Sequence, residues 1–382
     1  MAERCDALIV GAGPAGSSAA ILLAFAGWRV AILEKSRFPR RKVCGEYISG
    51  AAWPLLDELG VGARVAAMAG PEVRRVGFFA NDVVIDAPMP GGARPGRALG
   101  REHLDTFLVE RARECGVEVR EADAAVRIDL EAARIVIGAH GAWETGELPT
   151  QPRHVAARAH DLLGFKAHFS NAGLRRDLMP LLLFPGGYGG MVTTDGARVS
   201  LSCCVRRDAL ARARASRRGW RAADALLAHI ADANRGVREA LHGARVEGAW
   251  LSAGPIRPAI RRFRAGGVFA VGNAAGEAHP IVAEGISMAI QSSFLLCERL
   301  VRAGCDASDA ALDSVAREYE AAWRANFATR VRAAAALAAL ATRAPGRATA
   351  ARLVAMLPAV LTLGASWSGK DRALRRTLAE AD

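Results

Sequence analysis

The sequence predicts an α/β protein in which a helix-flanked parallel sheet is interleaved with a mostly antiparallel β-sheet and followed by a helical C-terminal tail. Three observations carry this prediction. A glycine-rich turn joins an apolar strand to a helix near the N-terminus, strand-like runs joined by turns fill the middle of the chain, and residues 306–382 have a helical pattern. A chain of 382 residues can bury a sizeable core.

The first unit covers residues 7–34. Residues 7–10 form a short apolar strand, a helix-like run continues to Phe25, and residues 29–33 form a second apolar strand that ends at Glu34. The turn between the first strand and the helix has the pattern GxGxxG. This order of strand, turn, helix, strand and acid is typical of the Rossmann-like unit that binds a dinucleotide.

Each part of that unit has a mechanical role. Gly11 permits the tight turn, Gly13 lets the backbone approach a pyrophosphate, and Gly16 lets helix and strand pack closely. The helix N-terminus offers free N–H groups to the phosphates, and the acid accepts hydrogen bonds from ribose hydroxyls. The predicted contacts of this unit with the cofactor are Gly11, Gly13, Ala15, Gly16, Glu34 and Lys35.

Two later segments complete the pattern. Residues 100–119 read as a helix followed by a strand, and residues 266–300 read as a strand, a Gly-Asn turn, a loop with Pro280 and a long amphipathic helix. In this order, over about residues 5–300, the motifs resemble the FAD-dependent oxidoreductases with the p-hydroxybenzoate hydroxylase fold, and most closely the branch that contains the geranylgeranyl reductases.

The resemblance implies FAD as cofactor and a division into interleaved parts. FAD-binding parts are expected at 1–75, 101–150 and 263–305, and parts of a substrate-binding sheet at 76–100 and 151–262, with a helical region at 306–382.

The segment from Lys42 to Glu46 matches a Lys-x-Cys-Gly-Glu motif of that branch. The resemblance implies that Arg41 or its neighbours approach the phosphate and adenosine side of FAD, while Cys44 and Gly45 lie near the flavin ring. Two roles are open for Cys44: participation in redox or acid–base chemistry, and packing against flavin or substrate.

The same resemblance places further residues at the cofactor. Arg101 corresponds to an arginine near the ribityl and phosphate portion. Gly272 and Asn273 replace a Gly-Asp pair, and the asparagine still offers an acceptor oxygen for a ribityl hydroxyl. Pro280, Gly285 and Ile286 belong to a loop and helix start that pass the flavin ring.

One departure concerns the electron donor. Where the hydroxylases have an Asp-Gly fingerprint with a downstream Ser and Arg, this chain has His140-Gly141 and Trp143. NAD(P)H remains the expected donor, but recognition of the usual hydroxylase kind is in doubt. His140 is either a proton donor near flavin or substrate, or a loop histidine that caps a turn.

The middle of the chain predicts the substrate sheet. An Asp195-Gly196 turn joins two strand-like runs. In residues 165–169, Phe and Ala alternate with Lys166 and His168, which favours a sheet with one buried face. The segment FPGGYGG at 184–190 resembles one that lines the substrate cavity. Two roles are therefore open for Tyr188: its hydroxyl is presented to substrate, or its ring only packs against neighbouring residues. Few ionic groups accompany these motifs, which favours an apolar substrate.

Composition and charge restrict the classes of molecule that we expect the protein to bind. The net charge is +12, but nucleic-acid-binding motifs are absent from the sequence, so no nucleic acid is expected. Seven cysteines without CxxC spacing indicate reduced thiols and no metal site, and the N-terminus does not resemble a signal peptide, so a cytoplasmic location is expected. The oligomeric state is left open.

The tail offers a second possibility. Residues 348–367 are apolar and interrupted by Pro358, and basic residues flank them out to residue 376. Such a segment docks on an anionic membrane surface or packs on the body of the protein. A peripheral position at the inner face of the membrane is therefore a further expectation.

The leading functional hypothesis is an FAD-dependent monooxygenase that hydroxylates a lipophilic aromatic or polyketide-type molecule. The alternative is an FAD-dependent reductase of double bonds in prenyl or quinone side chains. Two hypotheses of another class are an electron-transfer flavoprotein that serves a membrane quinone, and a degenerate flavin-fold partner subunit, the latter motivated by His140 and Asn273.

Overall fold

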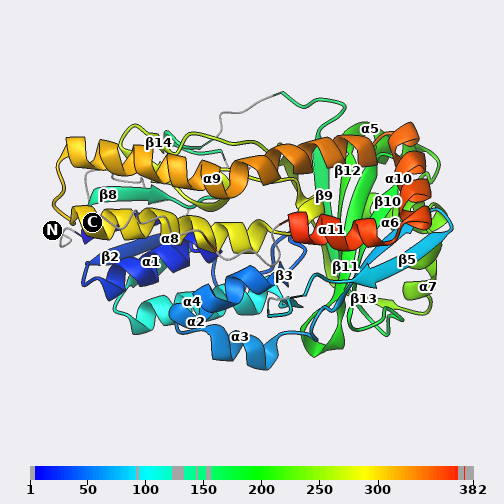
Figure 1. Cartoon of the computed structure of the whole chain (residues 1–382), viewed down its shortest axis with the longest axis horizontal. Helices are drawn as coiled ribbons and strands as arrows, with labels where there is room; N and C mark the ends of the chain where they lie inside the picture. Colours follow the sequence, from blue (N-terminus) through cyan, green and yellow to red (C-terminus); the bar gives the residue numbers. More distant parts are fainter. Residues whose placement is uncertain are drawn as a thin grey trace.

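The computed structural model describes residues 5–91, 94–122, 133–142, 145–151, 156–368 and 374. Two large sheets lie at opposite ends of an elongated molecule, and long helices run along it between them (Figure 1). Each sheet is assembled from segments that are far apart in the sequence, as the predicted interleaved α/β fold requires.

The first sheet has six strands in the order β14-β15-β8-β1-β2-β7. Neighbouring strands from β15 to β7 are parallel, while β14 runs antiparallel to β15. In this register Leu8 of β1 lies beside Ala31 and Val136. The strands are β1 (Cys5–Val10), β2 (Val30–Glu34), β7 (Glu118–Glu121), β8 (Ala133–Gly138), β14 (Arg264–Ala265) and β15 (Val268–Ala270). The near-continuous apolar runs of β1 and β2 are typical of parallel strands buried on both faces.

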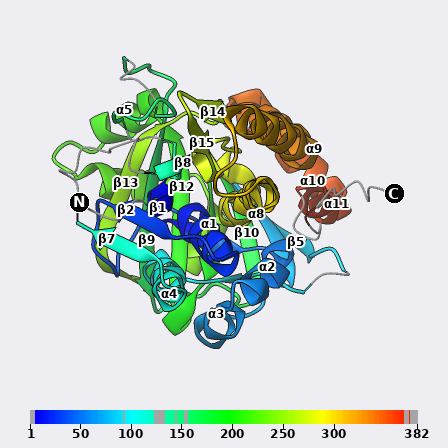
Figure 2. The same ribbon diagram turned by 90° about the vertical axis from the view of Figure 1, so that its left-hand side faces the viewer.

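Helices cover this sheet in layers. Helix α1 (Pro14–Phe25) packs against α4 (Arg101–Glu114) and α8 (Gly285–Ala303), and α9 (Asp309–Ala341) packs on the outside of α8 (Figure 2). A Cβ atom on Gly16 would lie 1.8 Å from the Gly11 carbonyl oxygen, so only glycine permits the close approach of α1 to the turn before it. Shorter helices lie beside α4, namely α2 (Trp53–Glu58) and α3 (Gly62–Met68), after the 3₁₀ turn η1 (Gly50–Ala52).

The second sheet has seven strands in the order β13-β9-β12-β11-β10-β4-β5. All neighbours are antiparallel except β10 and β4, which confirms a mostly antiparallel sheet. The strands are β4 (Arg75–Ala80), β5 (Val83–Pro88), β9 (Leu162–Ser170), β10 (Leu178–Phe184), β11 (Gly187–Thr193), β12 (Val199–Arg206) and β13 (Arg245–Ile256). The predicted turn is η2 (Asp195–Ala197), where Gly196 has a φ of +60°. A two-stranded ribbon of β3 (Tyr47–Ile48) and β6 (Arg97–Ala98) lies between the large sheets.

The prediction that this sheet has one buried face is wrong for β9. Phe165 and Phe169 pack towards α5 (Arg207–Ala215), α6 (Ala222–Asp232) and α7 (Arg235–Ala240). Lys166 and His168, on the opposite face, are also fully buried. Their face is covered by the loop that follows β2, so charged residues here are partners of a buried carboxylate rather than solvent contacts.

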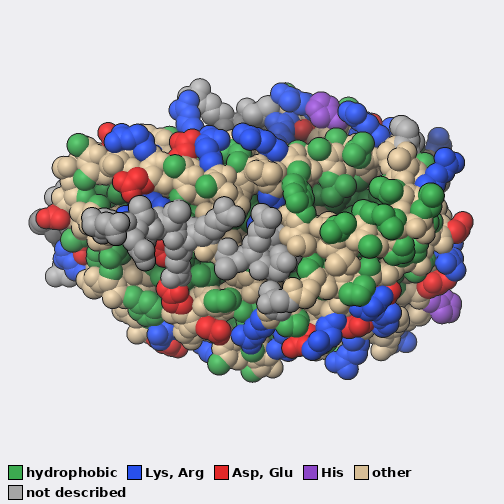
Figure 3. Space-filling view, in the orientation of Figure 1, with side chains coloured by type: hydrophobic (Ala, Val, Ile, Leu, Met, Phe, Trp, Pro, Cys, Tyr) green, Lys and Arg blue, Asp and Glu red, His purple; other side chains and the backbone are tan. Residues whose placement is uncertain are grey.

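The C-terminal helices pack against the second sheet. Helices α10 (Ala344–Met356) and α11 (Ala359–Trp367) pack on β4 and β5, and hydrophobic side chains gather around a hollow between the end of α9 and α11 (Figure 3). In the described part of the chain, no single helix is long and apolar enough to cross a membrane. The helices Ala348–Met356 and Ala359–Trp367 together have the length and apolar composition of a membrane span, but a bend of 111° separates them.

Candidate functional site

A large cavity joins the two halves of the molecule. Its volume is about 1260 Å³, and its lining includes the GxGxxG turn, the loop after β2, strands of the second sheet and the tail helices. Cavities that hold one small ligand usually measure about 300–1,000 Å³. The cavity therefore has room for a dinucleotide and a second molecule beside it.

Two helix N-termini open on this cavity. Gly13 precedes α1, and a Cβ atom there would meet only the Arg101 side chain, at 3.7 Å. Gly285 begins α8, and a Cβ atom there would meet nothing within 4 Å. Both glycines line the cavity, so the open space next to each of them is part of the cavity. Free N–H groups and the positive end of the helix dipole favour an anionic group at each position.

Glu34 presents an ionised carboxylate at the same end of the cavity. It is buried and accepts hydrogen bonds from the backbone N–H groups of Ala12 and Ser36, both at 2.9 Å. Burial alone would raise its pKa, but the charge of Arg40, 3.2 Å away, and the two N–H donors together lower it. An ionised carboxylate in this place suits the hydroxyls of a ribose, as predicted.

The basic residues Arg40, Arg41 and Lys42, which follow β2, do not all face the cavity. Arg40 and Lys42 line the cavity, and Nε of Arg40 has no hydrogen-bond partner among the described residues. The guanidinium of Arg41, predicted to approach the cofactor, instead donates to the Ala249 carbonyl at 3.3 Å and lies 3.4 Å from Nδ1 of His168. The Arg40 guanidinium itself is paired with two carboxylates, Glu34 at 3.2 Å and Asp105 at 3.5 Å.

Arg101 is a fixed cation in the cavity wall. Its guanidinium donates to both carboxylate oxygens of Asp105, at 2.7 and 2.8 Å, and it also interacts with the thiol of Cys44. Burial opposes its charge, but Asp105 and Cys44 outweigh burial and raise its pKa. The Cys44 sulfur also accepts a hydrogen bond from the backbone N–H of Glu46 at 3.3 Å. Cys44 is thus held by two donors at the cavity wall.

A buried charged cluster, here called the Glu46 cluster, fixes that loop. It comprises Glu46, Lys166 and His168, whose side chains are all fully buried. One carboxylate oxygen of Glu46 pairs with Nζ of Lys166 and accepts from the backbone N–H of Arg101 at 3.2 Å, and the other lies 2.7 Å from Nε2 of His168. Glu46 has a φ of +63°, a left-handed conformation that a non-glycine residue keeps only when its surroundings enforce it.

The Glu46 cluster makes stability depend on pH. Burial opposes ionisation of Glu46, but His168 and Lys166 outweigh it and lower its pKa from 4.5 to about 2. A carboxylate with a depressed pKa stabilises the fold above its unfolded pKa, and the effect is lost as pH falls from about 4.5 to about 2. The shift corresponds to about 3 kcal/mol. We expect the advantage of the wild type over Glu46→Gln in urea unfolding to shrink by that amount across this range. Parallel pH profiles of the two proteins would contradict the assignment.

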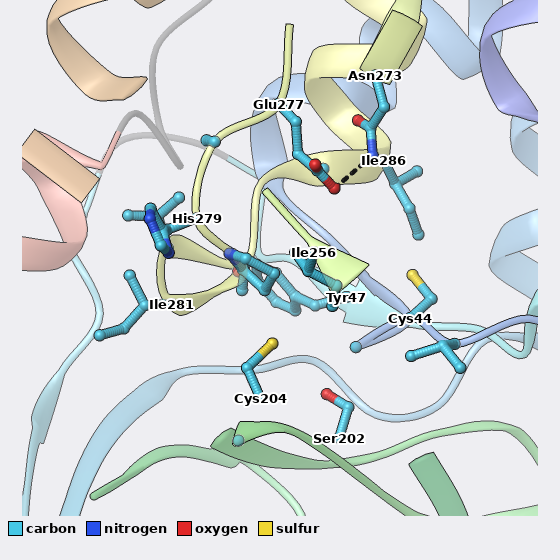
Figure 4. Close-up of a pocket in the computed structure, with 18 of the residues that line it drawn as sticks. Cys44, Tyr47, Ser202, Cys204, Ile256, Asn273, Glu277, His279, Ile281 and Ile286 are labelled. Atoms are coloured by element: carbon cyan, nitrogen blue, oxygen red, sulfur yellow. Dashed lines mark hydrogen bonds between the residues drawn. The ribbon is translucent and has the colours of Figure 1, made fainter. Parts of the chain in front are cut away.

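At the second sheet, two neutral polar side chains meet in the cavity. The Tyr188 hydroxyl lies 3.2 Å from Nδ1 of His279, and Tyr188 also interacts with the Cys204 thiol and the Ile281 backbone. Burial lowers the pKa of His279 to about 4 and raises that of Tyr188, and it raises the pKa of Cys204 to about 12. In Figure 4, His279 and Ile281 come from the loop before α8, and Cys204 and Ser202 come from β12. At neutral pH these three side chains are uncharged, and the nearby carboxylate of Glu277 adds to the rise in the pKa of Tyr188 and Cys204.

The structure brings most of the predicted site residues to one cavity. The lining contains Gly11, Gly13, Ala15, Glu34, Lys35, Cys44, Gly45, Arg101, His140, Tyr188, Gly272, Asn273, Pro280, Gly285 and Ile286. Gly16 serves helix packing, as described above. Asn273 donates to Glu277 at 3.1 Å (Figure 4).

His140 lines the cavity next to the glycine turn. It follows β8 beside the Gly11 turn, and its Nε2 lies 3.0 Å from Oγ1 of Thr150. Trp143 lies outside the described residues. Sequence reasoning missed His279 and Arg40, although each directly adjoins a residue that it did select.

Comparisons with known proteins agree with this geometry. The menaquinone reductase of Mycobacterium tuberculosis (strain CDC 1551 / Oshkosh) is 33% identical over 135 residues, which cover 35% of this chain and 33% of that protein. The chain thus matches about a third of the length of this relative. A digeranylgeranylglycerophospholipid reductase from Methanococcoides burtonii is 25% identical over 87% of this chain and 82% of its own length.

Solved structures show the same fold. The myxobacterial chondrochloren halogenase, an FAD-dependent halogenase, has a TM-score of 0.71 at 20% identity, covering 94% of this chain and 90% of its own. A probable FAD-dependent monooxygenase from Pseudomonas aeruginosa has a TM-score of 0.67 at 19% identity, covering 90% and 98%.

The predicted resemblance to FAD-dependent oxidoreductases of this fold is therefore confirmed. The family model described as the FAD binding domain matches residues 4–331, and these residues contain the glycine turn, Glu34, Arg101 and the start of α8 that line the cavity. The chain belongs to the FAD binding domain family.

Proposed function

We propose that the protein is an FAD-dependent oxidoreductase that reduces a carbon–carbon double bond in a lipophilic molecule, such as a prenyl or quinone side chain. The observation that carries this proposal is the continuity of the cavity from the glycine turn to an apolar end under the tail helices. Hydroxylation, the leading hypothesis from sequence, becomes the second candidate because aliphatic side chains of the tail helices line the apolar end.

The residues present fit FAD. Gly11, Gly13 and the N-terminus of α1 would hold the pyrophosphate, with Arg40 nearby, and Glu34 would hold the adenosine ribose. Arg101 and Asn273 would contact the middle of the cofactor, and Gly285 would place the N-terminus of α8 at the flavin ring. Reduced FAD, when bound, supplies the hydride for such a reduction. NAD(P)H is the proposed source of electrons.

The apolar end of the cavity suits a long aliphatic chain. Strands β4, β10 and β13 of the second sheet, the loop before α8 and the tail helices contribute to it, through Phe78, Leu183, Ile256, Ile281, Val354 and Leu361. A ligand chain buried against these side chains gains about 25 cal/mol for each Å² of apolar surface that is removed from water. Affinity for the substrate would therefore rise with the length of its apolar chain.

The Tyr188–His279 pair suits an uncharged polar group, such as a quinone carbonyl. Because both side chains are neutral near pH 7, they would donate or accept hydrogen bonds without favouring a phosphate. We expect Tyr188→Phe to raise the KM for a menaquinone about fivefold, the effect of one hydrogen bond worth about 1 kcal/mol. FAD content would stay unchanged, because the phenyl ring keeps the packing.

The matched control is a prenyl hydrocarbon that lacks a polar head. Its KM should be the same for wild type and Tyr188→Phe. Equal KM values for menaquinone in the two proteins would remove Tyr188 from substrate recognition.

The proposed reaction is tested by the mass of the product. The purified protein is supplied with NAD(P)H and menaquinone, and the product is re-oxidised in air before mass spectrometry so that ring reduction is reversed. A lasting gain of two hydrogens is the expected result. A gain of one oxygen atom, or an unchanged substrate while NAD(P)H is consumed, would refute the reduction.

Hydroxylation of an aromatic molecule is the second candidate. The same Tyr188–His279 pair, 3.2 Å apart in a buried wall, could orient a phenol hydroxyl. This candidate predicts the oxygen-containing product in the experiment above.

A further inference from the structure

The tail presents an unusual concentration of exposed apolar side chains. Twelve large hydrophobic side chains are exposed in the described part of the chain, and seven of them lie between residues 337 and 367. We call these seven the tail face: Leu337, Leu340, Leu353, Met356, Leu357, Leu363 and Trp367. Met356 is 84% exposed and Leu363 is 67% exposed. Isolated exposed hydrophobic residues are normal, but a contiguous group of them marks an interaction surface.

Between residues 321 and 370 every charged side chain is basic. No Asp or Glu occurs between Glu320 and Asp371 in the sequence. Arg332 of α9, Arg343 just before α10 and Arg352 of α10 are exposed, and within the described residues no carboxylate forms an ion pair with them. Arginines elsewhere on the surface commonly pair with acids, as Arg324 does with Glu320. An apolar face surrounded by unneutralised arginines is complementary to an anionic lipid surface.

The shape of the tail suits an interfacial position. The pair Ala348–Met356 and Ala359–Trp367 is bent by 111°, and neither helix alone could span a bilayer. One side of each helix packs on the protein, through Val354 in α10 and Leu361 in α11. The opposite sides carry Met356 and Leu363. A helix pair of this kind can rest at the lipid headgroups with its apolar residues inserted and its body attached to the enzyme.

The tail face is continuous with the cavity. Leu337, Leu340 and Leu353 are each at least 43% exposed and also line the cavity. Arg343 and Gly364 belong to the same lining. Hydrophobic side chains surround the hollow between α9 and α11 (Figure 3). A molecule that enters there passes from the tail face directly into the apolar end of the cavity.

We propose that the tail face docks on the surface of an anionic bilayer and opens the cavity towards it. The docking itself does not depend on the reaction. Its role as the entrance for a lipophilic substrate rests on the proposed function, and the two are tested by separate readouts.

Vesicle co-sedimentation of the FAD-loaded full chain tests the docking. We expect binding to vesicles of phosphatidylcholine mixed with phosphatidylglycerol, weaker binding to pure phosphatidylcholine, and a decrease with salt because screening weakens attraction to anionic lipid. The double variant Met356→Glu, Leu363→Glu should bind the mixed vesicles at least roughly tenfold more weakly, since it inserts charge into the apolar face. Arg352→Gln should weaken binding roughly fivefold.

The matched control is Trp220→Glu, because Trp220 is 52% exposed but lies between α5 and α6, outside the tail. It should bind like the wild type. Flavin absorbance of each variant reports that the fold is intact. A wild type that binds neither vesicle, or a double variant that binds as well as the wild type, would overturn the docking. Light scattering that shows the tail face joining two copies of this chain instead would also overturn it.

Measurements of turnover distinguish docking on the bilayer from entry of substrate through the tail face. With a short-chain quinone soluble in water, the double variant should keep wild-type turnover, because Met356 and Leu363 do not line the cavity. With a long-chain quinone embedded in mixed vesicles, its turnover should fall at least roughly tenfold, in step with binding. Normal vesicle binding with no turnover of either substrate would refute the proposed function and leave the docking standing. Lost binding with unchanged turnover of the embedded quinone would overturn the entrance.

Discussion

Replacing Lys166 by methionine is expected to lower the free energy of unfolding by about 3–5 kcal/mol, the usual effect of removing one partner of a buried ion pair. Lys166 is fully buried on β9, and its ammonium group pairs with the carboxylate of Glu46. Methionine fills a similar volume, so the loss comes from an uncompensated carboxylate rather than from a cavity. Urea unfolding followed by far-UV circular dichroism measures the effect.

Two further proteins sharpen this test. Arg221→Met removes a charge whose side chain is 84% exposed and pairs with Asp224, and it should change stability by less than about 0.5 kcal/mol. The double variant Glu46→Gln, Lys166→Met should be less destabilised than the sum of its single changes, because both charges are gone. Additive effects, or a Lys166→Met protein as stable as the wild type, would show that the pair does not support the fold.

The substitution Gly13→Val is expected to abolish FAD binding while leaving the fold intact. The Cβ position of Gly13 faces the cavity and meets no protein atom closer than 3.7 Å, so valine fits the protein but occupies the space of a pyrophosphate. We expect FAD affinity to fall roughly a hundredfold or more, equivalent to about 3 kcal/mol. The ratio of flavin to protein absorbance after desalting measures the loss.

Gly91→Val is the matched control for that change. Gly91 is exposed beyond β5, and a Cβ atom there meets nothing within 4 Å, so its valine variant should keep a full complement of FAD. A Gly13→Val protein that still carries stoichiometric FAD would place the cofactor elsewhere.

Local patterns predicted the elements around the glycine turn well. The strand, glycine turn, helix and Glu34 lie within thirty residues or so of each other in sequence, and their geometry follows from nearest-neighbour contacts and backbone conformation. The start of α8 at Gly285 was likewise evident, because a loop with Pro280 precedes a long amphipathic helix. These residues meet at the cavity because parallel strands present their carboxyl ends at one edge of a sheet.

Long-range contacts were the part that the sequence could not supply. Lys166 and His168 alternate with apolar residues, as on a strand with one solvent-exposed face, and only the arrival of Glu46 from 120 residues away makes their face a buried one. Arg40 and Arg41 are adjacent and chemically alike, yet they point to different partners. His279 became part of the site because β11 brings Tyr188 to it across 91 residues.

The central claim, reduction of a double bond by FAD held in this cavity, is tested most directly by a single-turnover experiment without oxygen. The FAD-loaded protein is reduced, freed of excess reductant and mixed anaerobically with menaquinone, and its absorption spectrum is followed. The account predicts that the oxidised flavin spectrum returns and that the product, after exposure to air in the absence of enzyme, keeps two additional hydrogens. A flavin that stays reduced until oxygen is admitted, with one oxygen atom then added to the substrate, would contradict the account and identify a monooxygenase.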